Sequence, residues 1–278
     1  MNEPAFRIMG VVNVTPDSFS DGGLFLDADK AIAHGVELAS EGADILDIGG
    51  ESTRPGAEPV DPDEELRRVL PVIEGLAGGP ARISIDTSKA AVASAALEAG
   101  ATVVNDVTAF RGDPAMVTLV ADSGADCCLM HMLGEPRTMQ QDPRYDDVVS
   151  EVKAFLSERL AFAVANGIAE QKIILDPGIG FGKTIEHNLE LLRRLDELVA
   201  LGRPVMVGFS RKSFLGRITG RDVGERVAST VAVNVLAYER GARIFRVHDV
   251  APTKDALEVA AATVRRGWSA TTPTSSTT

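Results

Sequence analysis

Polar residues able to bind or catalyse stand at the ends of short apolar runs throughout this sequence. The acidic and amide members are Asn13, Asp47, Asp86, Asn105 with Asp106, and Asp176. The imidazole, hydroxyl and basic members are His131, Ser210 with Arg211 and Lys212, and Arg246 with His248. A single aspartate in such a place is more often a helix cap or a loop hydrogen-bonding group. Its repetition along the whole chain favours one shared site.

The hydrogen-bond acceptors among these residues suit a particular kind of ligand. Asp86 and Asp176 offer carboxylates and Asn105 offers an amide. Together they match a ligand edge with several N–H donors, such as a guanidine-like heterocycle. Two carboxylates also fit a general acid and base, as in glycosidases, where the distance between the carboxyl groups decides the mechanism. The residue types leave both interpretations open.

The cations indicate an anion site. Arg54, Lys212, Arg246 and His248 lie on three different loops or strand ends of a chain whose 28 basic and 40 acidic residues give a net charge of −12. Local positive charge within an acidic protein is typical of a concave site that binds phosphate or diphosphate. The alternative is a set of unrelated ion pairs.

The order of the apolar runs predicts the elements that position these residues. Short runs rich in Val and Ile alternate with longer stretches of helical period, which is typical of repeated βα units and predicts an α/β fold. Parallel strands that close into an eight-stranded barrel end on one face, so their polar residues converge on one pocket. We expect strands at Phe6 to Val12, Asp44 to Ile48, Ala81 to Ile85, Thr102 to Val104, Asp126 to Met130, Lys172 to Leu175, Pro204 to Val207 and Arg243 to Val247.

Helices are expected between these strands. Examples are Asp29 to Glu41, Pro62 to Glu74, Lys89 to Ala99, Tyr145 to Asn166, His187 to Ala200 and Gly224 to Arg240. Several end at a glycine suited to a left-handed C-terminal cap: Gly42, Gly100, Gly167, Gly202 and Gly241. We expect a single (β/α)8 TIM barrel over residues 1–267, followed by a disordered Ser/Thr-rich tail over residues 268–278.

Composition excludes several classes of protein. The net charge of −12 disfavours a nucleic-acid binder, which needs clustered Lys and Arg. No apolar run approaches the ~20 residues of a membrane span, and the N-terminus lacks a signal-peptide pattern. The adjacent Cys127 and Cys128 cannot form a CxxC site and are expected to be buried thiols. We expect a soluble cytoplasmic protein.

Two apparent motifs carry less information than they suggest. The segment 176–184, DPGIGFGKT, is similar to a phosphate-binding P-loop, but Pro177 stands where that pattern needs its first glycine. Its glycine spacing also differs from that of a dinucleotide-binding loop. The histidines are too dispersed for a zinc cluster, and His34 and His187 are expected to be solvated.

Several segments resemble the dihydropteroate synthase family. They are NVTPDSFSDGG at 13–23, DIGGESTRPG at 47–56, IDT at 85–87, ND at 105–106, LMH at 129–131, DPGIGFGK at 176–183, SRKSFLG at 210–216 and RVHDV at 246–250. The resemblance implies a stand-alone bacterial (β/α)8 enzyme of folate synthesis. Such an enzyme joins 6-hydroxymethyl-7,8-dihydropterin diphosphate to p-aminobenzoate, releasing diphosphate and forming 7,8-dihydropteroate.

The resemblance also implies a role for each site residue. The pterin ring would be bound by Asp86, Asn105, Met130, Asp176 and Lys212. The diphosphate would be held by Asn13, Thr53, Arg246 and His248, with Mg²⁺ as the cofactor bridging its oxygens to the metal ligand Asn13. The p-aminobenzoate would contact Phe19, Arg54, Pro55, Phe181 and Ser213. The catalytic residues would be Asp21, Asp86, Lys212, Arg246 and His248.

The implied reaction is a dissociative substitution at the exocyclic methylene, which needs no protein nucleophile. The family also implies a homodimer. Three alternatives remain open: a pterin-binding barrel of the methyltetrahydrofolate:corrinoid methyltransferase type, a catalytically silent pterin-binding paralogue, and an unrelated barrel acting on sugar phosphates. The SRK and RVH segments argue against the first, because that chemistry needs no anion site.

Overall fold

The strands form one parallel sheet that closes on itself. The computed structural model describes residues 4–15, 24–52, 56–135 and 137–264. Hydrogen-bonded neighbours follow the order β6-β5-β4-β3-β2-β1-β8-β7, and a parallel bridge between Leu175 and Val205 joins the two ends of that order. The predicted (β/α)8 barrel is confirmed. The strands are β1 (Arg7–Asn13), β2 (Ile45–Gly49), β3 (Arg82–Asp86), β4 (Val103–Asp106), β5 (Asp126–Met130), β6 (Ile173–Asp176), β7 (Met206–Val207) and β8 (Ile244–Val247).

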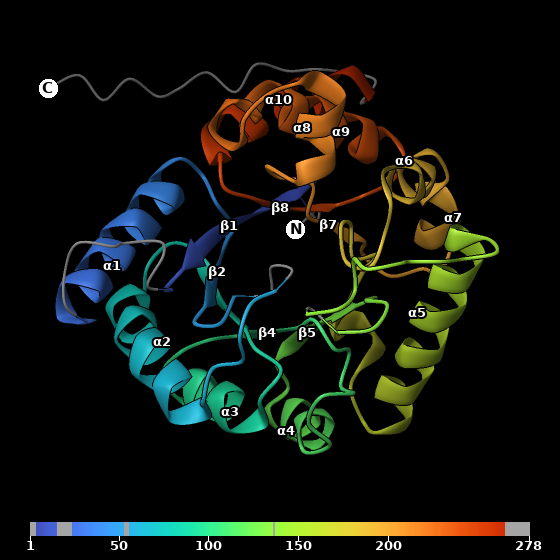
Figure 1. The fold of residues 1–278 in the computed structure, drawn as a ribbon. Helices are drawn as coiled ribbons and strands as arrows, with labels where there is room; N and C mark the ends of the chain where they lie inside the picture. The colour runs from blue at the N-terminus through green and yellow to red at the C-terminus, as the bar shows by residue number, and fades with distance from the viewer. Residues whose placement is uncertain (1–3, 16–23, 53–55, 136, 265–278) are drawn as a thin grey trace, which may run out of the picture.

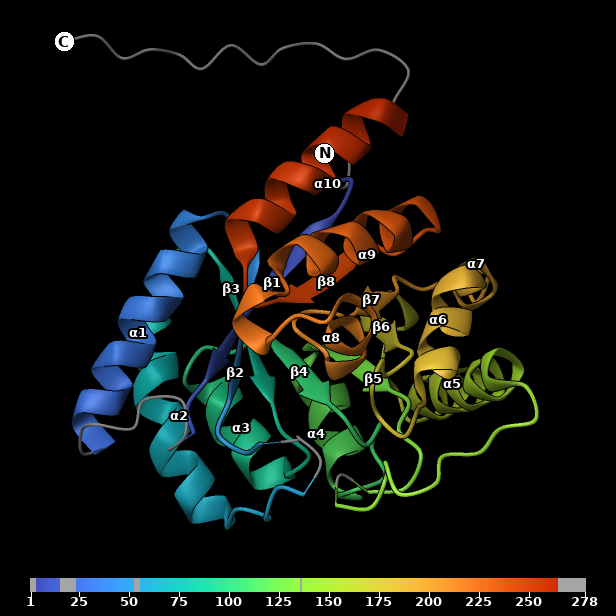
Figure 2. The ribbon, with the colours of Figure 1, turned by 45° about the horizontal axis from the view of Figure 1, so that its top comes forward.

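The helices form an outer ring around these strands (Figure 1). The turned view shows α9 and α10 side by side next to β1 and β8 (Figure 2). The helices are α1 (Leu24–Ser40), α2 (Pro62–Leu76), α3 (Ala90–Glu98), α4 (Met116–Ser123), α5 (Val148–Ala165), α6 (Ile185–Arg193), α7 (Leu195–Val199), α8 (Ser213–Thr219), α9 (Val227–Glu239) and α10 (Val250–Val264).

The ends of the helices follow the glycine pattern, with one exception inside a predicted helix. The glycines expected as caps have φ between +81° and +118°: Gly42, Gly100, Gly167, Gly202 and Gly241. The single helix expected over His187 to Ala200 is wrong, because it divides into α6 and α7. Arg194 separates them at φ −110° and ψ 28°, where its guanidinium is paired with Asp147 and Glu197.

Several strands run further than their apolar pattern predicts. Asn13, Asp86 and Asp176 are the last residues of β1, β3 and β6, and β4 includes Asn105. Backbone pairing continues through these positions, as between Met130 and Asp176. The expected strand ends were one or two residues short because polar side chains face the barrel interior at this end. These four side chains are therefore anchored within strands.

An apolar layer fills the barrel interior directly below the polar residues. Its members are Met9, Ile45, Cys128, Ile174, Met206 and Ile244, all buried. Successive side chains of a strand point to opposite faces, so the residue two positions further on faces the same interior. Those residues include Asp47 after Ile45, Met130 after Cys128, Asp176 after Ile174 and Arg246 after Ile244. The two-residue spacing thus places a polar layer above an apolar floor.

The two cysteines face opposite sides of the barrel wall. Both are buried and unpaired thiols, as expected. Cys127 packs in the large core between the sheet and the helices, whereas Cys128 belongs to the interior layer. Burial raises the pKa of Cys127 to about 12 and also raises that of Cys128, so neither is a thiolate at neutral pH.

None of the described helices is long and apolar enough to span a membrane. The tail expected over 268–278 and the boundary expected at residue 267 lie outside the described residues.

Candidate active site

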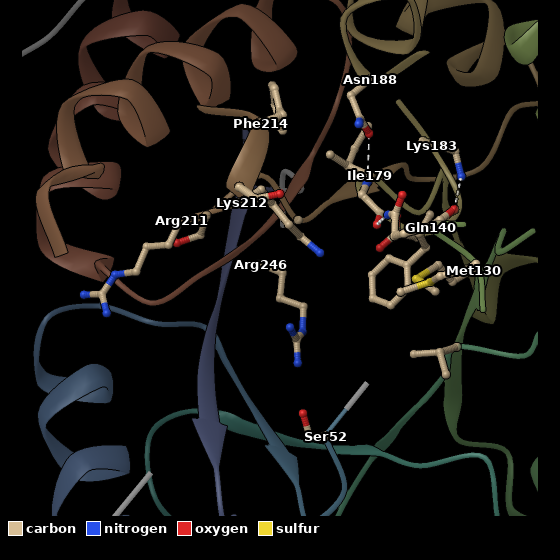
Figure 3. Close-up of a pocket in the computed structure, with 18 of the residues that line it drawn as sticks. Ser52, Met130, Gln140, Ile179, Lys183, Asn188, Arg211, Lys212, Phe214 and Arg246 are labelled. Carbon is tan, nitrogen blue, oxygen red and sulfur yellow. Dashed lines mark hydrogen bonds between the residues drawn. The ribbon is translucent and has the colours of Figure 1, made fainter. Parts of the chain in front are cut away.

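One cavity at the carboxyl ends of the strands brings the predicted residues together. Its volume is about 1260 Å³. All predicted site residues that the structure describes line it: Asn13, Asp86, Asn105, Met130, Asp176, Phe181, Lys212, Ser213, Arg246 and His248. Phe19, Asp21, Thr53, Arg54 and Pro55 lie outside the described residues. Figure 3 shows Lys212 and Arg246 on one side of this cavity and Met130 on the other.

A buried network of charges lies at the floor of the cavity. The Arg246 guanidinium lies between two carboxylates, with Nε 2.6 Å from Asp47 Oδ2 and Nη2 2.8 Å from Asp86 Oδ2. Asn105 Nδ2 donates to the same Asp47 oxygen at 3.1 Å. Burial, and then the Asp47 charge, raises the pKa of Asp86 to about 7, so this carboxyl titrates near neutral pH.

This network changes the expectation for Arg246. Burial alone would lower its pKa, but the carboxylates of Asp47 and Asp86 outweigh that effect and keep the guanidinium charged. The sequence predicts Arg246 as an anion ligand, whereas in this structure it first neutralises two carboxylates. Asp47 was among the polar residues at strand ends but had no assigned role. Its spacing of two from Ile45 places it on the interior face, a signal that could have assigned it to the site.

Asp176 forms a second acceptor site on the other side of the floor. Its Oδ1 accepts a hydrogen bond from the backbone N–H of Gly178 at 2.7 Å. The residue is almost fully buried, and burial raises the pKa of the carboxyl to about 6 although this hydrogen bond opposes the shift. With Asp86 and Asn105, it places buried acceptors around the floor, as a ligand edge rich in N–H groups requires.

The mouth of the cavity carries a cation above an aromatic ring. Lys212 Nζ lies 4.3 Å from the centroid of the Phe181 ring, a cation–π geometry. Ser213 begins α8 directly after Lys212. Phe181 reaches this position from the glycine-rich segment after β6, where it packs against a methionine-rich cluster containing Met130.

The loops after β7 and β8 are joined by two polar contacts. Ser210 Oγ accepts a hydrogen bond from the backbone N–H of His248 at 3.1 Å and lies 3.0 Å from its Nδ1. Arg211 binds both carboxylate oxygens of Asp249, at 3.0 Å and 2.6 Å. These contacts hold the loop that carries Lys212 against the loop that carries His248.

The expectation that His248 contributes a positive charge is wrong for this structure. Burial, and then the nearby Arg246 charge, lowers its pKa to about 4, so the ring is neutral at neutral pH. The Ser210 hydroxyl, which already accepts from the backbone, can give its proton to Nδ1. His248 then carries its own proton on Nε2, as a neutral donor.

Asp106 is a structural residue, although it follows an apolar run like the others. Its carboxylate accepts hydrogen bonds from the backbone N–H and hydroxyl of Thr108 and from the N–H of Phe110. These bonds hold a loop in which Ala109 and Phe110 adopt φ of +53° and +63°. The motif pattern alone does not separate this aspartate from Asp86 and Asp176.

A buried pair beside the cavity was not predicted as a pair: His131 was among the polar residues at strand ends, whereas Lys183, which lines the cavity, had no assigned role. Lys183 Nζ lies 2.9 Å from His131 Nδ1 and donates to the Phe181 carbonyl at 3.0 Å. Burial lowers the pKa of Lys183 to about 7 and that of His131 to about 2. His131 is therefore a neutral acceptor. Only the tertiary fold brings these two residues together.

Gly178 is expected to be intolerant of a side chain. An added Cβ would lie 1.8 Å from the His131 carbonyl oxygen, and the residue has φ +67°. Gly178→Ala should therefore lose about 3 kcal/mol or more of unfolding free energy. Gly202→Ala is the matched control, because φ is +81° but nothing lies within 4 Å of the added Cβ. We expect it to lose about 1 kcal/mol. Equal losses in urea unfolding would show that the close approach to His131 is unimportant.

Comparisons with known proteins agree with this fold. The model of the pterin binding enzyme family matches residues 9–248. The chain therefore belongs to the pterin binding enzymes, a class consistent with its barrel and its acceptor-lined floor. Within this class it is a member of the dihydropteroate synthase family, as the relatives below show.

The relatives are similar over almost their whole length. Dihydropteroate synthase of Neisseria meningitidis serogroup B is 50% identical over 259 residues, covering 91% of each chain. The solved structure of Xanthomonas albilineans dihydropteroate synthase with 4-aminobenzoic acid has a TM-score of 0.86 at 52% identity, covering 91% of each chain. Another structure of the Xanthomonas albilineans enzyme, in complex with 7,8-dihydropteroate, has a TM-score of 0.83 at 49% identity and the same coverage.

Proposed function

We propose that this protein joins 6-hydroxymethyl-7,8-dihydropterin diphosphate to p-aminobenzoate, forming 7,8-dihydropteroate and diphosphate in folate synthesis. The observation that carries the proposal is the arrangement of one cavity, with buried acceptors at its floor and Lys212 over Phe181 at its mouth. Membership of the dihydropteroate synthase family supports it. Solved structures of a relative with 4-aminobenzoic acid and with 7,8-dihydropteroate also support it.

The floor of the cavity would bind the pterin ring. The ring's amino and N–H groups are donors, and Asp176, Asp86 and Asn105 supply buried acceptors from three strands. The side chain of Met130 offers an apolar, polarisable surface for a flat ring. Burial raises the pKa of Asp176 to about 6. Hydrogen bonds donated by the pterin would stabilise the charged form of this carboxyl.

The diphosphate would lie near Arg246, His248 and Asn13, all of which line the cavity. The Nε2–H of neutral His248 and the guanidinium of Arg246 can both donate to phosphate oxygens. We propose that Mg²⁺ assists, with Asn13 as its protein ligand. The described residues hold no cluster of His, Cys, Asp and Glu that could chelate a metal alone. Mg²⁺ often uses one or two protein oxygens together with substrate phosphates, and the Asn13 side chain would supply one such oxygen. When bound, the ion would neutralise charge on the leaving diphosphate.

The bond to diphosphate would break before the new C–N bond is complete. The methylene carbon then carries positive charge, which the electron-rich dihydropterin spreads and a nearby Asp86 carboxylate stabilises. The neutral aromatic amine attacks this carbon, so no covalent protein intermediate is needed. The cysteines agree with this, since both are protonated and neither lines the cavity. Asp21 is proposed to share the role of Asp86 from outside the described residues.

The p-aminobenzoate would occupy the mouth of the cavity. Phe181 offers a ring to stack on, and Ser213 offers a donor near its carboxylate. Lys212 is proposed to contact both the pterin and the aminobenzoate. We propose that Phe19, Thr53, Arg54 and Pro55 complete the site from segments outside the described residues. Thr53 would contact the diphosphate, and the other three would contact the aminobenzoate.

Turnover with the three components tests the proposal. Purified protein, dihydropterin diphosphate, p-aminobenzoate and Mg²⁺ are expected to release diphosphate only when p-aminobenzoate is present. Tight pterin binding in calorimetry without any such release would support the alternative, a catalytically silent pterin-binding paralogue.

We also propose a cytoplasmic homodimer. Exposed apolar side chains on α8, α9 and α10 support an interface there, namely Ile218, Leu236 and Val259. Sedimentation equilibrium should give twice the chain mass of 29.4 kDa. A monomer at micromolar concentration would contradict the dimer.

A further inference from the structure

The segment between β6 and α6 that carries Phe181 is held by hydrogen bonds to its backbone carbonyls. The Gly178 carbonyl accepts from the N–H of Phe181 at 3.1 Å. The Gly180 carbonyl accepts from Gln140, and the Gly182 carbonyl accepts from the Tyr145 hydroxyl at 2.9 Å. Donors from the long loop after β5 therefore hold this segment from outside.

Phe181 itself lies between two residues that can change conformation easily. Gly180 and Gly182 have φ of +80° and +64°, a region open to glycine at little cost. A ring flanked by such residues is not fixed by local backbone stiffness. Its position depends on the groups that bind its own backbone, and among the described side chains the donor to its carbonyl is Lys183, at 3.0 Å.

Lys183 is itself anchored from the end of β5. Its Nζ lies 2.9 Å from His131 Nδ1 (Figure 3 labels Lys183). His131 is fixed in turn, because its N–H donates to the Asp176 carbonyl at 3.0 Å and its ring packs edge-on against Phe155 at 4.9 Å. The Lys183 side chain is almost fully buried. It therefore connects the Phe181 backbone to a rigid part of the barrel.

The amine of Lys183 acts here as a hydrogen-bond donor. Burial lowers its pKa to about 7, an effect that Asp176 opposes and Lys212 reinforces. In the neutral amine, two N–H bonds remain, which suffice for His131 and the Phe181 carbonyl. Neither contact depends on a full positive charge beside Lys212.

We propose that Lys183 is a positioning residue that fixes the Phe181 ring beneath the ammonium group of Lys212 and thereby sets the binding of the aromatic amine substrate. This inference rests on the proposed function, in which Phe181 contacts p-aminobenzoate. Lys183 touches neither substrate in this account. We expect its effect on the pterin floor to be small, because Asp86, Asn105 and Asp176 are held within strands.

Substitution of Lys183 by Met tests the inference, since Met keeps an unbranched apolar side chain but removes both hydrogen bonds. We expect the KM for p-aminobenzoate to rise about tenfold, the effect of losing roughly one hydrogen bond to a buried carbonyl. The KM for dihydropterin diphosphate should stay within about twofold of wild type. Lys172→Met is the matched control, because Lys172 pairs with Asp126 at the opposite end of the barrel. It should leave both KM values unchanged.

A general structural role predicts a different pattern. Equal rises in both KM values, or an unchanged KM for p-aminobenzoate, would overturn the inference. If Lys183→Met does not fold, His131→Leu and His131→Asn carry the test. The Asn variant keeps an acceptor near the position of Nδ1, so it should retain the wild-type KM for p-aminobenzoate, whereas the Leu variant should raise it. The same rise in both variants would also reject the inference. An inactive wild-type protein, by contrast, would reject the proposed function itself.

Discussion

Replacing Asp176 by asparagine is expected to weaken pterin binding by on the order of 100-fold while making the ligand-free protein more stable. The affinity falls because a charged acceptor is lost and an N–H₂ group can face the donors of the pterin. Stability rises because the buried carboxylate is unfavourable in the empty site. The pKa of Asp176 is about 6, against 3.8 for an unperturbed carboxyl. Asparagine can keep the acceptor for the Gly178 N–H.

The pH dependence of stability gives this prediction a definite sign. Between pH 3.8 and about 6 the folded protein binds more protons at Asp176 than the unfolded chain does. The stabilising contribution of this group is therefore present below that interval and is lost as the pH rises through it. The Asn variant should lack this loss and be more stable at pH 8 by about 1 to 3 kcal/mol in urea unfolding. Wild-type pterin affinity in calorimetry, or lower stability at pH 8, would refute the assignment.

Arg246→Met is expected to cost about 3 to 5 kcal/mol of unfolding free energy at pH 8, together with most of the activity. The variant leaves the carboxylates of Asp47 and Asp86 buried without the cation that lies between them. Without this cation the pKa of Asp86 should rise further. The variant should therefore recover part of its lost stability as the pH falls from 8 to 5, because protonation removes the repulsion.

Arg243→Met is the control for this experiment. Arg243 precedes the same strand, but its guanidinium donates to the backbone carbonyls of Tyr238 and Ala242. We expect its loss to cost about 1 kcal/mol, with little dependence on pH. A deficit in Arg246→Met that is small, or that does not change with pH, would mean that the buried network does not have the electrostatics described above.

The fold and the membership of the site followed from local patterns in the sequence. Short Val- and Ile-rich runs marked the strands. Glycines such as Gly42 and Gly241 marked helix ends, and in the structure both have positive φ. Closure of the barrel then brought Asp86 and Asp176 into one cavity, since all strand ends open on the same face. These features depend on neighbours along the chain or on a general rule of the fold.

The charge states and partners of the site residues could not be predicted in this way. Arg246 contacts Asp47 only through the tertiary fold, because the two residues are 199 positions apart in the sequence. His248 was expected to be a cation, but burial and Arg246 make it neutral. Lys183 looked like part of a glycine-rich loop, and its contact with His131 depends on packing between β5 and the loop after β6. The charge states and partners of these residues depend on burial and on contacts between distant segments, which local sequence patterns do not show.

The most direct test of the proposed reaction follows the nitrogen atom of the amine. The protein is incubated with dihydropterin diphosphate, Mg²⁺ and ¹⁵N-labelled p-aminobenzoate, and the products are analysed by mass spectrometry and a diphosphate assay. We predict that 7,8-dihydropteroate retains the label and forms in equal amount to the released diphosphate. Diphosphate release without labelled dihydropteroate, or no release at all from protein that binds the pterin, would contradict the proposal.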